Sequence, residues 1–171
     1  MSSMLGLAPV IDFDGTVVTL DVAWGELRAR LGVRRIDELW DDPDDGWTAV
    51  AHAEEEAASC AAPVATVLDA LRGAQAVAVL TSNSEAAVWR FLARYDELRE
   101  VVAAVVGRET LAGPKSDYEV FARGFRRCAE ATAMARPAGE RVVYVGDQSY
   151  ELSFARRLGA RALHVSEIAA L

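Results

Sequence analysis

Two aspartates, Asp12 and Asp14, follow a short apolar run near the start of the chain. Side chains alternate along a strand, so both carboxylates point the same way while Phe13 points to the opposite face. Two like charges this close favour a cation between them, and hard oxygen ligands suit Mg²⁺. Ligands of open α/β sheets bind at the carboxyl ends of strands, so the pattern indicates a metal site there. An ordinary turn before Gly15 is the alternative interpretation.

A second polar segment, Thr81-Ser82-Asn83-Ser84, follows the apolar run 76–80. Hydroxyls and backbone N–H groups at the start of a helix form a site for an anion, which fits Thr81 and Ser82. Ser82 or Ser84 also fits the N-cap of a helix that begins near Glu85, and the two roles are compatible.

Two further segments carry charged residues after apolar runs. Lys115 is the only lysine of a chain that otherwise uses arginine, which suggests that a compact ammonium is needed there. A solvated lysine is the ordinary alternative. Asp147 follows the run 141–145, and Glu151 lies one helical turn later. Asp147 also fits the N-cap of the next helix.

The elements that position these residues alternate along the chain. Apolar runs at 76–80, 101–106, 141–145 and 160–165 join the first one as expected strands. Between them, apolar residues recur at helical spacing in four groups: Val64, Val67, Leu68 and Leu71; Val88, Phe91, Leu92 and Tyr95; Phe121, Phe125 and Cys128; and Leu152, Ala155 and Leu158. This alternation predicts an α/β fold with a doubly wound, Rossmann-like parallel sheet of about five strands.

Residues 19–61, here called the insert, break the alternation. One helix is expected to end near Gly32, a turn follows at 41–46, and an Ala- and Glu-rich helix is expected over about 47–59.

We therefore divide the chain into an α/β core of residues 1–18 and 62–171 and a small helical cap of residues 19–61. The first strand ends at the expected site, so the insert must start there. We expect it to form a lid over the strand ends, which excludes water when it closes.

The insert also holds aromatic and cationic side chains, namely Trp24, Trp40, Trp47, Arg28, Arg30, Arg34 and Arg35. Aromatic rings stack on a sugar or a base, and arginines clamp a second anionic group of a substrate. Packed core tryptophans and solvated arginines are the more common arrangement. The sequence therefore leaves the substrate open.

Bulk properties exclude several classes of protein. The net charge of −8 opposes binding to nucleic acid. The sequence has no run of 18 apolar residues, so we expect no membrane span. The first residues lack the basic region of a signal peptide. Cys60 and Cys128 are far apart and fit reduced thiols. These features predict a cytoplasmic protein without nucleic-acid or membrane partners, and they leave its oligomeric state open.

The ordered set of residues after four strands resembles the haloacid dehalogenase (HAD) superfamily of phosphotransferases. Motif one is matched by Asp12-Phe13-Asp14-Gly15-Thr16, motif two by Thr81, motif three by Lys115, and motif four by Gly146-Asp147 with Glu151. The segment from Tyr144 to Ala160 looks like the phosphoglycolate-phosphatase-like branch. The insert stands where that superfamily places its type-one cap.

The resemblance implies a magnesium-dependent phosphatase that hydrolyses a small-molecule phosphate monoester through an aspartyl-phosphate. Asp12 would be the nucleophile. Asp14 would protonate the leaving oxygen and later deprotonate water. Mg²⁺ would be held by Asp12, Asp147 and the backbone carbonyl of Asp14.

The resemblance also implies how substrate is held. Thr81 and Ser82 would bind the phosphoryl oxygens, and Lys115 would neutralise the charge of the transferring group. Two features depart from the family pattern. Motif four ends in Glu151 rather than aspartate, which bears on magnesium affinity. The insert is short for a cap of this type, which predicts a more open site.

Alternatives within the fold follow from the same residues. Asp14 argues against a dehalogenase, which lacks the second aspartate, and against a phosphonate hydrolase, which replaces it. A phosphomutase keeps it, although the insert has no lysine and its histidine, His52, fits a solvated helix face. A non-catalytic HAD-fold binding or scaffold module is the other alternative.

Overall fold

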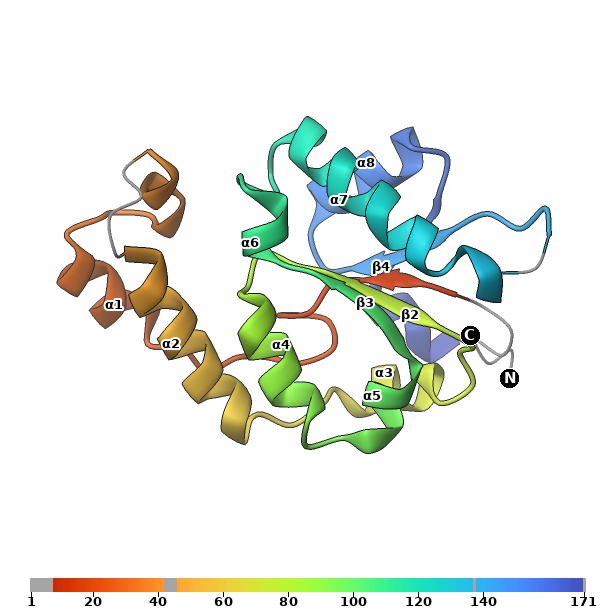
Figure 1. Cartoon of the computed structure of the whole chain (residues 1–171), viewed down its shortest axis with the longest axis horizontal. Coiled ribbons are helices and arrows are strands. Elements are labelled where there is room, and N and C mark those ends of the chain that lie inside the picture. Colours follow the sequence, from red (N-terminus) through yellow and green to blue (C-terminus); the bar gives the residue numbers. More distant parts are fainter. Residues whose placement is uncertain (1–7, 42–45, 137, 171) are drawn as a thin grey trace.

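The computed structural model describes residues 8–41, 46–136 and 138–170 of the chain (Figure 1). Five parallel strands form one sheet in the order β3-β2-β1-β4-β5. They are β1 (Val10–Ile11), β2 (Val77–Leu80), β3 (Val102–Val106), β4 (Val143–Gly146) and β5 (Arg161–His164). The predicted α/β fold with a doubly wound parallel sheet is therefore confirmed.

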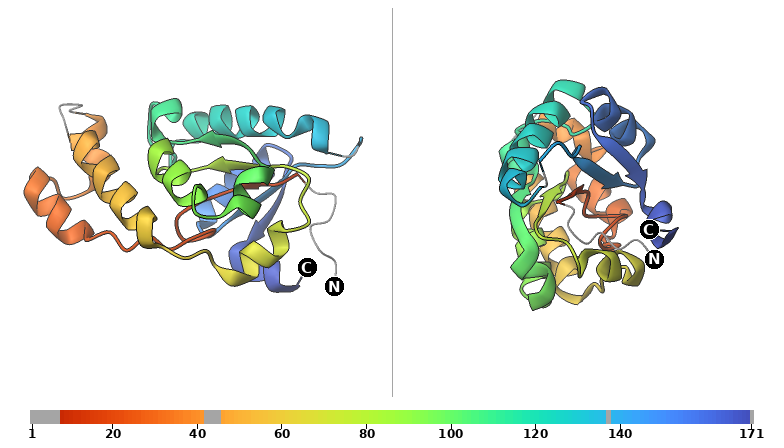
Figure 2. Two further views of the ribbon diagram at one scale, coloured as in Figure 1. Left: turned by 60° about the horizontal axis from the view of Figure 1, so that its bottom comes forward. Right: turned by 90° about the vertical axis from the view of Figure 1, so that its right-hand side faces the viewer.

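Helices cover both faces of this sheet (Figure 2). One face packs against α3 (Ala65–Leu71), α4 (Glu85–Leu92), α5 (Asp96–Val101) and the 3₁₀ helix η3 (Val165–Ala170). The other packs against α6 (Arg108–Leu111), α7 (Tyr118–Ala131) and α8 (Ser149–Arg157), and the short η2 (Ala133–Ala135) follows α7. Because both faces are covered, the central strands are apolar throughout.

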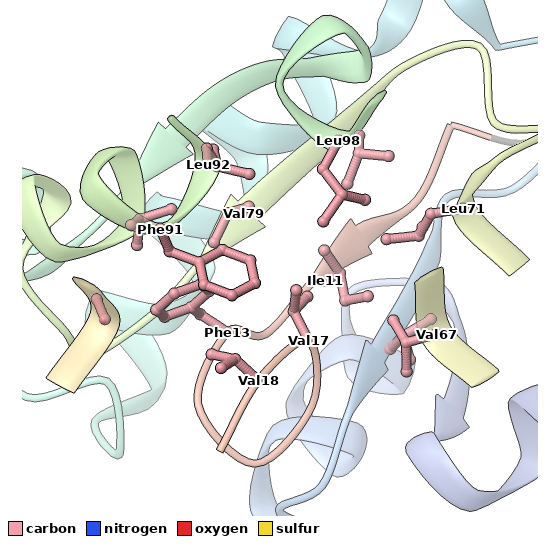
Figure 3. Packing of buried hydrophobic residues seen from close by; sticks show 14 of the residues in the cluster. Ile11, Phe13, Val17, Val18, Val67, Leu71, Val79, Phe91, Leu92 and Leu98 are labelled. Carbon is pink, nitrogen blue, oxygen red and sulfur yellow. The ribbon is translucent and has the colours of Figure 1, made fainter. Parts of the chain in front are cut away.

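Alternating strand residues divide the core into two layers. Ile11 and Val79 point toward α3 and α4, whereas Val10 and Leu80 point toward α7. Figure 3 shows the first layer, in which Phe13 packs edge-on against a phenylalanine of α4 with ring centroids 5.4 Å apart. This contact anchors the segment that carries the two aspartates.

The insert forms α1 (Trp24–Leu31), a 3₁₀ helix η1 (Ile36–Trp40) and α2 (Gly46–Cys60). Figure 1 shows α1 and α2 beyond one end of the sheet. Helix α1 ends as predicted at Gly32, whose φ of 70° suits glycine. The predicted turn at 41–46 falls mostly on residues 42–45, which lie outside the described residues.

Two details differ from the sequence prediction. The sequence does not predict η1, because five residues are too few to show a helical period. Tyr95 was expected on the same helix as Phe91, but α4 ends at Leu92 and Tyr95 is the N-cap of α5. The two rings still pack, with centroids 4.9 Å apart, so the apolar face continues across the break. Within the described ranges, none of the helices combines the length and apolarity that a bilayer crossing requires.

Candidate active site

The segment after β1 makes a tight turn that presents Asp12 at the carboxyl end of the sheet. The Asp12 N–H donates to the carbonyl of Val145 at 2.8 Å, which continues the pairing of β1 with β4. The N–H groups of Thr16, Val17 and Val18 then donate to the Phe13 carbonyl. Gly15 has φ 81°, and a Cβ there would lie 2.7 Å from Oδ2 of Asp147. Glycine is needed for both reasons.

Asp14 lies on the same side as Asp12 and lines the same cavity. Its Oδ1 accepts a hydrogen bond from the Leu20 N–H at 2.8 Å. Burial raises the pKa of Asp14, and the nearby Glu54 carboxylate adds to the rise, while the Leu20 N–H opposes it. Asp14 therefore holds a proton more readily than an exposed aspartate does, which suits an acid–base group.

Lys115 is buried and contacts three acceptors. Its ammonium forms ion pairs with Asp12 and with Oε1 of Glu151, the latter at 2.7 Å, and donates to the carbonyl of Leu80 at 3.1 Å. Although burial lowers the pKa of Lys115, the attraction of the two carboxylates raises it above its ordinary value. Burial raises the pKa of Asp12 to about 7, although Lys115 lowers it. Lys115 is thus a buried counter-ion rather than a solvated lysine.

Glu151 lies in the first turn of α8 with its side chain buried. Its Oε2 accepts from the Tyr144 hydroxyl at 2.7 Å, and its Oε1 accepts from the Tyr150 hydroxyl at 3.2 Å as well as from Lys115. Both oxygens of the glutamate are therefore occupied by donors of the protein.

Carboxylate oxygens of Asp12, Asp147 and Glu151 all lie within 4.8 Å of one another. Asp147 does not cap the following helix, because Gln148 holds the N-cap position of α8. Its Oδ2 accepts from Nε2 of Gln148 at 2.6 Å. Its Oδ1 is buried and has no hydrogen-bond partner in the part of the chain that the structure describes. A free buried carboxylate oxygen beside a second carboxylate fits a hard divalent cation.

The loop after β2 carries the expected anion-binding residues. The Thr81 hydroxyl donates to Oδ1 of Asn83 at 2.8 Å and accepts from the Asn83 N–H at 3.1 Å. Ser84 is the N-cap of α4, because its hydroxyl accepts from the Ala87 N–H at 3.1 Å. Ser82 is exposed and lines the cavity. The capping role therefore falls on Ser84 and leaves Ser82 facing the cavity.

A cavity of about 540 Å³ joins these residues to the insert. Its lining includes the residues that the sequence predicts for the site, namely Asp12, Asp14, Thr81, Ser82, Lys115, Asp147 and Glu151. The insert contributes Trp24, Trp40, Trp47, Arg28 and Arg35. The structure thus brings the sequence-predicted residues to one place. Three tryptophans face this cavity instead of only filling a core, whereas Arg30 and Arg34 do not line it.

Sequence reasoning missed a buried charged pair that lines the cavity. Glu54 of α2 and Arg108 of α6 form a buried ion pair, with Nη2 to Oε2 at 2.8 Å. Glu54 stands among glutamates on an Ala-rich helix, and Arg108 is one arginine of many. Neither has a local signal that distinguishes it from a solvated charge, because their pairing is a tertiary contact.

A family model described as haloacid dehalogenase-like hydrolase matches residues 45–165. No curated protein matches the sequence. Solved structures of similar fold include CbbY from Rhodobacter sphaeroides in complex with phosphate, with a TM-score of 0.62 and 18% identity over 92% of this chain and 84% of that one. Protein Tyrosine Kinase A (PtkA) from Mycobacterium tuberculosis matches with a TM-score of 0.60 and 19% identity. The match covers 92% of this chain and 82% of that one. A HAD-superfamily hydrolase of subfamily IA from Geobacter sulfurreducens matches with a TM-score of 0.52 and 18% identity. The match covers 94% of this chain and 88% of that one.

Proposed function

The chain belongs to the haloacid dehalogenase-like hydrolase family, and from this premise we propose that it is a magnesium-dependent phosphatase. Its substrate would be a small-molecule phosphate monoester. The observation that carries the proposal is the convergence of Asp12, Asp14, Lys115 and Asp147 on the wall of a single cavity. These residues come from three separate parts of the chain, so their meeting is a property of the fold.

Asp12 would attack the phosphorus atom and form an aspartyl-phosphate as the bond to the leaving oxygen breaks. Lys115 holds Oδ1 of Asp12, so Oδ2 is the oxygen left to attack. Asp14, whose pKa burial raises, would give its proton to the leaving oxygen. It would then take a proton from the water that hydrolyses the intermediate.

Mg²⁺, when bound, supplies positive charge that reduces the repulsion between a carboxylate and a phosphate ester. Asp12, Asp147 and the backbone carbonyl of Asp14 would hold it, and the unpaired Oδ1 of Asp147 supports this assignment. Glu151 would act mainly by holding Lys115 in place, because its oxygens already accept from Lys115 and two tyrosines.

Thr81 and Ser82 would receive the phosphoryl oxygens. The Thr81 hydroxyl donates to Asn83 in this structure, so it would exchange that hydrogen bond for one to the substrate. Ser82 is exposed to the cavity and needs no such exchange.

The test is turnover of p-nitrophenyl phosphate by the wild-type protein with Mg²⁺ and with EDTA. We expect Asp12→Asn to lose turnover while it keeps its folded circular dichroism spectrum, because asparagine is nearly isosteric but not an effective nucleophile. Asp69→Asn is the matched control, since Asp69 is exposed on α3 and outside the cavity. Deamidation of the variant is checked by mass spectrometry.

The outcomes separate the alternatives. Turnover that persists in a clean Asp12→Asn preparation contradicts the role of Asp12. No turnover of any phosphate monoester by the wild type favours a non-catalytic module. Phosphoryl transfer between positions of a sugar phosphate favours a mutase. The structure gives this alternative no support from His52 of the insert, because that residue is exposed and does not line the cavity.

A further inference from the structure

The Glu54 carboxylate accepts four hydrogen bonds, two on each oxygen. Oε1 accepts from Nη1 of Arg108 and from Nδ2 of Asn83, both at 3.0 Å. Oε2 accepts from Nη2 of Arg108 at 2.8 Å and from the backbone N–H of Ser84 at 2.9 Å. Its side chain is 2% exposed, so protein donors replace the water that would otherwise solvate this charge.

These bonds join the insert to the loop after β2. Glu54 lies on α2 of the insert, whereas Asn83 and Ser84 belong to the Thr81–Ser84 loop. Arg108 holds the same loop from its other side: its backbone N–H donates to the Asn83 carbonyl at 2.9 Å, and its Nη1 donates to the Ser82 carbonyl at 3.2 Å. The ion pair therefore fixes the loop from both directions.

The contacts also set the direction of a hydrogen-bond relay. Because the Asn83 amide group donates to Glu54, its oxygen faces Thr81 and accepts from the Thr81 hydroxyl at 2.8 Å. The orientation of the Thr81 side chain thus depends on a residue 27 positions earlier in the chain. A neutral or shorter side chain at position 54 cannot hold the same four donors.

Stability alone is a weak reason for this arrangement. Burying an ion pair costs solvation, and well-packed apolar side chains often stabilise a protein as much or more. The pair lies instead on the wall of the cavity, where Arg108 also stacks over the Trp47 ring with its Cζ 4.6 Å from the centroid. Its placement points to a role in ligand binding.

We propose that Glu54 is a positioning residue that holds the Thr81–Ser84 loop and Arg108 in the geometry that receives a phosphoryl group. The inference rests on the proposed function, since it assigns the phosphoryl-binding loop of that site. It adds a role for the insert: α2 supplies a fixed part of the phosphate-binding wall, because Glu54 ties it to the core.

The experiment measures binding of inorganic phosphate by isothermal titration calorimetry in the presence of Mg²⁺, together with KM and kcat for p-nitrophenyl phosphate. We expect Glu54→Gln to weaken phosphate binding and raise KM by at least about 10-fold, with a smaller change in kcat, because the loop that binds phosphate is displaced. Glu56→Gln is the matched control, an identical change at an exposed position two residues later on α2. It should leave all three values within about 2-fold of the wild type.

A merely structural role predicts a different result. In that case Glu54→Gln lowers the melting temperature but leaves the phosphate Kd and KM of the folded protein unchanged, and this outcome overturns the proposal. If Glu54→Gln does not fold, Glu54→Asp replaces it, since the shorter side chain keeps the charge opposite Arg108 but withdraws it from the loop. Unchanged phosphate binding by a folded Glu54→Asp variant also overturns the proposal.

The same measurements distinguish failure of the proposed phosphatase function from failure of the positioning role. If the wild type binds phosphate but hydrolyses no phosphate monoester, the phosphatase assignment is wrong, and the calorimetry still decides the role of Glu54. If the wild type binds no phosphate, the positioning role is wrong as well.

Discussion

Replacing Lys115 with methionine removes the cation that contacts both Asp12 and Glu151. Methionine has a similar length and no charge, so the change isolates the ammonium. The two carboxylates would remain buried, at 7% and 2% side-chain exposure, without their counter-ion. Breaking a buried ion pair by removing one partner typically costs about 3–5 kcal/mol. For a chain of this size, that corresponds to a fall in Tm of roughly 6–20 °C.

The pH dependence of this loss follows from the pKa of Asp12. Burial raises that pKa to about 7 in the wild type even though Lys115 lowers it, so it rises further in the variant. A carboxyl group with a raised pKa contributes stability below its unfolded value, near 3.9, and loses it as the pH rises through the folded value. Below about pH 7 Asp12 is protonated in both folded proteins, so we expect the stability deficit of Lys115→Met to be smallest there and to grow as the pH rises through 7 toward the higher folded pKa of the variant.

The assay is thermal and urea unfolding followed by circular dichroism at pH 9 and pH 5, with EDTA present to exclude metal binding. Arg99→Met is the control, because it removes an exposed cation of α5 and should change stability by less than about 0.5 kcal/mol. A Lys115→Met variant within about 1 kcal/mol of the wild type at pH 9 refutes the reasoning, as does a deficit that grows in acid.

Three further outcomes are expected. Asp147→Ala should lose phosphatase activity without recovery at high Mg²⁺, measured as rate against metal concentration, whereas recovery would contradict its place in the metal site. Burial raises the pKa of Cys128 to about 12, so an alkylating reagent at pH 8 should modify the exposed Cys60 alone until the protein is denatured, as read by mass spectrometry. Gly124→Ala should destabilise the protein by about 1–3 kcal/mol in urea titrations, because the new Cβ would lie 2.5 Å from a leucine methyl of α6. Gly25→Ala is the control and should not destabilise the protein, because a Cβ at Gly25 meets open space.

The sequence predicts the sheet well, because each strand is a local apolar run and the longer helices of the core show a local period. The residues that follow the strands are also predictable, since parallel strands bring their carboxyl ends to one edge. Asp12 and Lys115 meet across 103 positions for this reason. Their roles in catalysis stay predictions.

What the sequence does not predict is which charges become buried. Glu54 and Arg108 lie 54 positions apart in the sequence, and they meet because the fold places α2 beside the loop after β2 and the start of α6. The tryptophans of the insert show the same limit. Their composition fits a core more often than a binding surface, and only the folded structure shows that the rings of Trp40 and Trp47 lie at the cavity, with centroids 4.7 Å apart and planes tilted by 51°.

Because the sequence contains a single lysine and that lysine is 3% exposed, a lysine-specific protease has one cleavage point, enclosed by the folded site. The protein is cut there only when the segment between α6 and α7 opens. The cleavage rate under native conditions therefore reports the population of that opened form, without an added label. Ligands that bind the closed site should slow the cut in proportion to their occupancy, so proteolysis can serve as a screen for substrates that needs no turnover.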